Sequence, residues 1–235
     1  MFKYLLIHNL CMDIAQVSQE KSGASLEIQA NVEKKLQFDA DEALKRFGQL
    51  EELLSEEKLF GMQIEKQLPE EWNFQSIVLC DASKNRAIDA QLCKLAFAKG
   101  FSPTIVLAST NYKSMLNSLV NSNVDVSKIF LLDCVSRNLT LLKDTEKVFF
   151  VDSLRSLSDV QIKIINLIEL NKKTCFIFDS LDALLLFHNS KTILKFVSSL
   201  NKILRKNSSV AFFLSANQEL SEQLSQFFEV IVEVK

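Results

Sequence analysis

The stretch "SIVLCDASKNRAIDAQLCKLAFAKG", residues 76–100, carries the pattern from which the fold can be predicted. A short apolar run, Ile77 to Cys80, meets a small polar loop, and the loop leads into an amphipathic helical pattern. Six further apolar runs follow along the chain, at 104–108, 129–132, 148–151, 174–178, 209–214 and 229–234. Continuous apolar strands separated by helices are typical of a parallel sheet covered on both faces. The sequence therefore predicts an α/β domain with a mostly parallel sheet.

Three of the helical patterns between these runs have a well-defined apolar face. Their apolar residues recur at the three- and four-residue spacing of an α-helix. They are Tyr112, Met115, Leu116, Leu119 and Val120 in the first, Val160, Ile164, Leu167 and Ile168 in the second, and Ile193, Phe196, Val197, Leu200 and Leu204 in the third. We expect these faces to pack on the sheet.

The N-terminal part of the chain has a different character. Residues 1–68 contain no convincing strand and are rich in Glu, Gln, Lys and Leu. The stretch "DADEALKRFGQLEELLSEEKLF", residues 39–60, places leucines and Phe47 on one helical face, and Gly23 marks the end of an earlier helix. We expect residues 1–70 to form a helical extension, as a hairpin packed on its own chain, and residues 71–235 to form the α/β domain. A coiled coil or docking arm for a partner is the alternative for the extension.

Composition narrows the class of protein. The chain has 235 residues and a formal net charge of -2, which gives no reason to expect nucleic acid or an anionic membrane as a partner. The apolar run at the start is too short for a membrane span and lacks a signal-peptide cleavage site. None of the five cysteines forms a C-x-x-C pair, which fits a reducing cytoplasm. We expect a cytoplasmic protein.

Four of the predicted strands end in an aspartate: Asp81, Asp133, Asp152 and Asp179. Ligands of open α/β sheets bind outside the carboxyl ends of the strands, and carboxylate oxygens suit Mg²⁺. These residues would therefore suit a metal or Mg-nucleotide site. The alternative, which we favour for the first three, is that each aspartate caps the turn or helix that follows. Asp179 is treated separately because "TCFIFDS", residues 174–180, lies one strand before "SVAFFLSAN", residues 209–217, and this position strengthens the ligand interpretation.

Taken in order, residues 74–235 resemble the RecA/KaiC-type ATPase core, and more specifically a group of archaeal KaiC-like proteins with degenerate nucleotide motifs. The segments that carry this are "TIVLASTNYKSMLNSL" (104–119), "NVDVSKIFLLDCVSR" (123–137), "VFFVDSLRSLSDVQIKI" (148–164), "CFIFDSLDALLLFHNSKTILKFVSSL" (175–200) and "FFEVIVEVK" (227–235). The resemblance covers about two-thirds of the chain and leaves out the helical extension. It implies that Asp179 stands where the Walker B aspartate holds the Mg²⁺ water shell, with Ser180 beside it.

The departures from that family concern the phosphate loop. A P-loop reads G-x-x-x-x-G-K-[ST], whereas residues 81–87 read "DASKNRA", without glycine. Only Lys84 or Arg86 would stand in for the phosphate-binding lysine, and Asp81 would repel phosphate. If a nucleotide binds, the resemblance implies contacts from Lys84, Asn85, Arg86, Asp179 and Ser180. The ligand would be ATP or ADP with Mg²⁺, and Asp179 the residue that holds the metal.

The catalytic glutamate of the family is missing as well. It would follow the next strand, where this chain reads Ser109-Thr110-Asn111, with no carboxylate. Hydrolysis of ATP is therefore not expected. The leading hypothesis is a pseudo-ATPase: a non-catalytic RecA/KaiC-like domain that acts in regulation or assembly through a protein partner or a homo-oligomer.

Two other hypotheses stay open. A nucleotide sensor would bind ATP or ADP with little or no hydrolysis. An enzyme of another class would use the aspartates at the sheet edge, Asp133 and Asp152 among them, to bind a metal for different chemistry.

Overall fold

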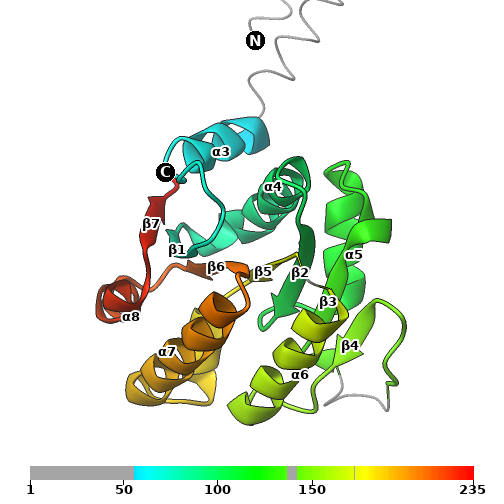
Figure 1. Ribbon diagram of the computed structural model, residues 1–235, viewed down its shortest axis with the longest axis vertical. Helices are drawn as coiled ribbons and strands as arrows, with labels where there is room; N and C mark the ends of the chain where they lie inside the picture. The colour runs from blue at the N-terminus through cyan, green and yellow to red at the C-terminus, as the bar shows by residue number, and fades with distance from the viewer. Residues whose placement is uncertain (1–55, 137–141, 172) are drawn as a thin grey trace, which may run out of the picture. The chain divides into compact units, whose positions relative to one another are not determined.

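The computed structural model describes residues 56–136, 142–171 and 173–235 (Figure 1). The chain divides into two compact units, Met1–Leu54 and Ser55–Lys235. The first unit holds most of the predicted helical extension, and it lies outside the described residues. The hairpin and docking-arm hypotheses for that part therefore stay predictions.

A single sheet of seven parallel strands forms the centre of the second unit. The strands are β1 (Gln75–Leu79), β2 (Ser102–Leu107), β3 (Phe130–Asp133), β4 (Val148–Phe150), β5 (Thr174–Phe178), β6 (Val210–Ser215) and β7 (Val230–Glu233). They lie in the order β4-β3-β2-β5-β6-β1-β7, and every neighbouring pair is parallel. All seven predicted strands are confirmed, as is the parallel sheet.

Helices cover both faces of this sheet (Figure 1). The helices are α3 (Glu56–Glu65), α4 (Asn85–Ala98), α5 (Tyr112–Asn121), α6 (Leu157–Leu170), α7 (Ser190–Lys206) and α8 (Gln218–Leu224). One apolar cluster joins strand residues such as Val78 to α3, α4 and α5, and a second joins residues such as Ile77 to α6, α7 and α8. Because successive strand residues point to opposite faces, strands β1 to β6 contribute to both clusters, whereas β7 contributes only to the first. In the part of the chain that is described, no helix combines the length and apolar character needed to cross a membrane.

The predicted apolar faces of the helices are confirmed for α6 and α7, whose predicted face residues are all buried. In α5 the prediction is partly wrong. Met115 and Leu119 are fully buried, but Val120 is 55% exposed. The buried stripe of α5 is narrow, so the residue next to Leu119 already faces solvent.

Helix α3 closes one edge of the sheet. Strand β7 is an edge strand, and the side-chain amide of Gln67, just after α3, bonds to both backbone groups of Glu233. Its Nε2 donates to the Glu233 carbonyl and its Oε1 accepts from the Glu233 N–H, each at 2.9 Å. The N–H of Lys235 donates to Oε1 of Gln63 at 3.3 Å. This pairing mimics that of a neighbouring strand and protects the edge from another chain. Helix α3, which lies within the first 70 residues, thus packs as part of the α/β unit.

Candidate functional site

The loop after β1 forms a short 3₁₀ turn, Ala82–Lys84, and Asp81 is its N-cap. One carboxylate oxygen of Asp81 accepts from the N–H and the hydroxyl of Ser83, both at 3.1 Å, and its carbonyl accepts from the N–H of Lys84 at 2.9 Å. The bonds from Ser83 hold the pKa of Asp81 below its ordinary value. The capping interpretation of Asp81 is confirmed. A phosphate loop offers its backbone N–H groups to the ligand. Here the N–H groups of Ser83 and Lys84 donate instead to the carboxylate and the carbonyl of Asp81.

The three polar residues after this cap take separate directions. The ammonium group of Lys84 lies 5.2 Å from the centre of the Phe60 ring. The side chain of Asn85 donates to the carbonyl of Asp179 at 2.9 Å, and Arg86 donates to the hydroxyl of Thr110 at 3.5 Å. Asn85 and Arg86 thus reach the ends of β5 and β2, whereas Lys84 is drawn toward α3.

Asp179 is buried and fully engaged by β2. One carboxylate oxygen accepts from the N–H of Ala108 at 2.7 Å, and the other accepts from the hydroxyl of Ser109 at 2.8 Å. The N–H of Ser109 lies 3.2 and 3.1 Å from the two oxygens. Burial raises the pKa of Asp179 to about 6, although the hydrogen bonds from Ala108 and Ser109 act in the opposite direction. The carboxylate fastens the end of β5 to the end of β2.

The predicted magnesium and nucleotide residues are mostly bonded to the protein itself. Both oxygens of Asp179 already have donors, and the hydroxyl of Ser180 accepts from the N–H of Ala183 at 3.3 Å. Across residues 56–136, 142–171 and 173–235, no three His, Cys, Asp or Glu side chains converge closely enough to hold a metal ion. Of the five residues predicted to contact a nucleotide, only Asn85 and Asp179 bond to each other, and they do so through a backbone carbonyl.

A buried carboxyl group that the sequence analysis missed lies one turn into α4. Asp89 has no exposed surface, and neither of its carboxyl oxygens has a hydrogen-bond partner among the described residues. Burial raises its pKa well above the ordinary value; nearby Asp179 adds to this effect, and Arg86 opposes it. The helical pattern offered a signal, since Asp89 lies next to Ile88 and four residues before Cys93 on the buried face.

Of the remaining aspartates of the carboxyl edge, Asp133 binds backbone groups of the segment that follows its strand. Asp133 is buried and accepts from the N–H groups of Tyr112, Val135 and Ser136, each at 2.8 Å, and from the Ser136 hydroxyl at 2.6 Å. The capping interpretation of Asp133 is therefore confirmed. Asp152 lies on the surface.

The position expected for a catalytic glutamate also has a structural role. Asn111 is the N-cap of α5 and accepts from the N–H of Ser114 at 2.9 Å. Ser109 is bound to Asp179, and Thr110 accepts from Arg86. No group in this tripeptide can take a proton from water as a carboxylate does.

Comparison with known proteins bears on the fold. Neither the models of known protein families nor the curated proteins give a match to this sequence. Among solved structures, the chain is similar to a KaiC-like protein from the hyperthermophilic archaeon Pyrococcus horikoshii OT3, with a TM-score of 0.53 and 14% sequence identity. The similarity covers 75% of this chain and 77% of that chain. Together with the seven-stranded parallel sheet, this similarity shows that the chain has a RecA/KaiC-like fold.

Proposed function

We propose that this chain is a non-catalytic RecA/KaiC-like domain that acts in regulation or assembly by binding a protein partner. The observation that carries the proposal is the state of Asp179. It lies where the resemblance expects the magnesium aspartate, yet its two oxygens bind Ala108 and Ser109. A carboxylate used in this way stabilises the sheet and has little capacity left for a hydrated metal.

The phosphate loop supports the same conclusion. Asp81 places a negative charge at the mouth of the loop, and its oxygens take the donors of Ser83 and Lys84. A nucleotide would have to break these bonds and bring its phosphates beside the carboxylate. Both steps oppose binding.

Exposed apolar side chains in the segment that follows β5 support a protein partner. Leu186 is 79% exposed and Phe187 is 41% exposed, and both follow β5 in the segment after Asp179. The guanidinium group of Arg155 lies 5.6 Å from the centre of the Phe187 ring. Adjacent exposed apolar and aromatic residues beside an arginine have the composition of protein interaction surfaces.

The second candidate is the nucleotide sensor, and one observation favours it. Asn85 and Arg86 both extend over the ends of β5 and β2, where a ligand of an open α/β sheet would lie. A sensor would use these two donors in place of a phosphate loop.

Isothermal titration of the full chain with ATP and with ADP, each with Mg²⁺, separates these two functions. We expect no saturable heat for the wild type or for Asp179→Asn and Arg86→Ala. Micromolar binding, about -8 kcal/mol, that weakens in Arg86→Ala would overturn the non-catalytic scaffold and favour the sensor.

Site-specific photo-crosslinking tests the partner. A benzophenone amino acid in place of Leu186 is expected to crosslink one protein, or a second copy of this chain. The same group in place of Val120, which is 55% exposed on α5, serves as the matched control. The captured protein, once purified, must bind the wild-type chain in titration and bind Leu186→Ser more weakly. Equal binding of the captured protein to the wild type and to Leu186→Ser would contradict a role of Leu186 in binding the partner.

A further inference from the structure

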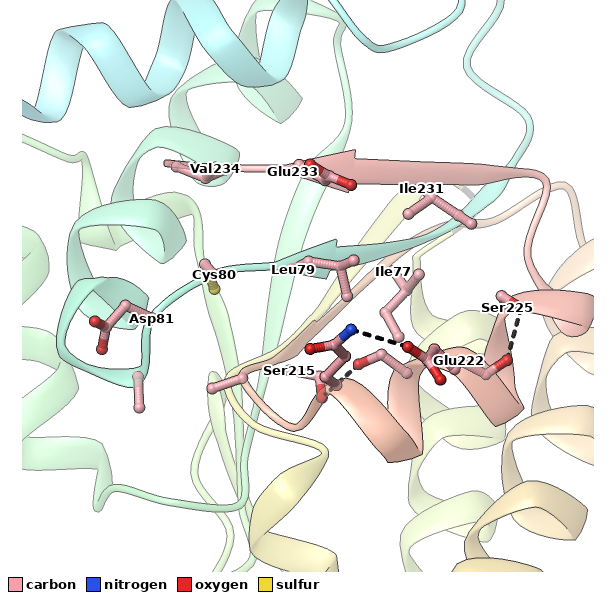
Figure 2. Close-up of a pocket in the computed structure, with 14 residues that line it drawn as sticks. Ile77, Leu79, Cys80, Asp81, Ser215, Glu222, Ser225, Ile231, Glu233 and Val234 are labelled. Atoms are coloured by element: carbon pink, nitrogen blue, oxygen red, sulfur yellow. Dashed lines mark hydrogen bonds between the residues drawn. The ribbon is translucent and has the colours of Figure 1, made fainter.

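A groove of about 830 Å³ lies between strands β1 and β7 and helix α8 (Figure 2). Ile77, Leu79 and Ile231 form an apolar floor on the α8 side of the strands, and Ile77 lies directly opposite Ile231 in the parallel pairing. Ile231 is 47% exposed, so α8 leaves this part of the sheet face incompletely covered. The volume is within the range of about 300–1,000 Å³ that binding pockets have.

The charged groups around this groove are all acidic. Among the described residues that line it are Asp81, Glu222 and Glu233, and none of the lining residues is Lys, Arg or His. Lys235 does not line the groove, but its ammonium group lies 3.5 Å from Glu233 and offsets part of the charge of that carboxylate. A concave surface with charge of one sign concentrates ligands of the opposite sign.

On the α8 side of the groove, most polar side chains already have hydrogen-bond partners in the protein, so the carboxylates are the groups available to bind a ligand. The hydroxyl of Ser221 bonds to the carbonyl of Asn217 at 2.7 Å, and that of Ser225 donates to the carbonyl of Glu222 at 2.8 Å. The side-chain amide of Gln218 donates to one carboxylate oxygen of Glu222 at 2.9 Å, which leaves the second oxygen to face a ligand. The two hydroxyl groups and the side-chain NH₂ group of Gln218 thus direct a proton to the protein itself, so the groove offers a ligand mainly acceptors.

This chemistry disfavours a phosphate ligand and favours a cation with an aliphatic body. Alternate residues of an extended chain point the same way and lie about 6.6–6.8 Å apart, which is also the spacing of Ile77 and Leu79 on the floor. An extended segment can therefore set one side chain on each floor residue. Its intervening side chains point away from the floor, and long basic side chains can bend back from there to the carboxylates of Glu222 on α8 and Glu233 on β7.

We propose that the groove binds an extended segment of a protein partner in which aliphatic side chains alternate with lysine or arginine. This inference rests on the proposed function, which supplies the partner, and it states which chemistry the partner presents. The segment would bury Ile231, and its basic side chains would pair with Glu222 and Glu233. Both contacts would stabilise the complex.

The test uses a fluorescein-labelled nonapeptide of alternating valine and lysine, with a reference peptide in which glutamate replaces lysine. Fluorescence anisotropy with the full chain at low salt is expected to show saturable binding of the lysine peptide alone. Glu222→Lys and Ile231→Ser should each weaken it about tenfold or more. Glu146→Lys makes the same charge change at an exposed site before β4, at the opposite edge of the sheet, and should leave it unchanged.

Several outcomes would overturn the groove proposal. They are no binding of the lysine peptide, equal binding of both peptides, an equal loss in Glu146→Lys, or no effect of Ile231→Ser in a variant whose urea unfolding matches the wild type. In each of these cases a partner crosslinked at Leu186 would still support the proposed function. Nucleotide binding that requires Arg86 would overturn the proposed function whatever the peptide does.

Discussion

Replacement of Asp89 by asparagine is expected to stabilise the protein at neutral pH. Asp89 is fully buried and neither of its oxygens has a partner among the described residues, so the folded state favours its protonated form. Ionisation of such a group in the folded protein is costly because no hydrogen-bond donor compensates the charge and the attraction of Arg86 offsets only part of the cost of burial. Asparagine has nearly the same shape and cannot ionise. The variant therefore keeps the packing and removes the dependence on a proton.

The size of the effect follows from proton linkage. Because burial raises the pKa of Asp89 and of Asp179, the folded state binds more protons than the unfolded state, and the free energy of unfolding falls as pH rises. Each extra proton contributes about 1.4 kcal/mol per pH unit. The Asp179 contribution ends near its folded pKa of about 6 and amounts to about 3 kcal/mol. The Asp89 contribution continues until the pH passes the folded pKa of Asp89, and only this part disappears in Asp89→Asn.

Urea unfolding between about pH 5 and pH 8 measures this difference. Trp72 is the only tryptophan, and it packs against Phe74, Phe101 and Phe212, so its fluorescence reports on the core. The stability of Asp89→Asn relative to wild type should grow by about 1.4 kcal/mol per pH unit from pH 5 until the pH passes the folded pKa of Asp89. Glu146→Gln, at an exposed site, should show no such trend. A difference that stays constant with pH, or that favours the wild type as pH rises, would refute the reasoning.

Three further predictions concern named contacts. Asp179→Asn should remove the part of the fall in unfolding free energy that the wild type shows between about pH 4 and pH 6, in the same urea assay, because the amide cannot ionise; a fall that persists unchanged in the variant would contradict this role of Asp179. Gln67→Ala should cost about 1 kcal/mol and speed hydrogen exchange at the Glu233 amide, measured by NMR, whereas unaltered exchange would mean that the edge is protected in another way. On a Cys11→Ser background, the four buried thiols should not react with a thiol reagent at pH 8 until urea is added. The reason is that burial raises the pKa of Cys80 to about 12 and also raises the pKa of Cys93, Cys134 and Cys175. Rapid labelling without urea would disprove this prediction.

The strands could be predicted because a buried strand appears in the sequence as a short, continuous apolar run. In β5 all five residues, Thr174 to Phe178, are buried, so the sequence reads as a continuous apolar run. The position of β1 between β6 and β7 has no such trace. It depends on pairs such as Gln75 with Ala211, which are far apart in sequence. Among the comparisons, the similarity to a KaiC-like structure supports this arrangement.

The candidate site divides in the same way. The caps formed by Asp81 and Asp133 involve residues close in sequence, so the residue type and its place after a strand were sufficient to predict them. The burial of Asp89 depends on what packs over α4, and the groove depends on the distance between α8 and β7. Both features depend on how elements far apart in sequence pack together, which no short stretch of sequence specifies.

The order of the strands also constrains how the chain folds as it is synthesised. Strand β1 is the first of the seven to leave the ribosome, yet its two neighbours, β6 and β7, are the last. Strands β2 to β5 can pair with one another beforehand, since β2 lies next to both β3 and β5. Until residues 210–233 emerge, Ile77 and Val78 have no partner strand, so a nascent chain at that stage exposes an apolar, unpaired strand that is prone to aggregation.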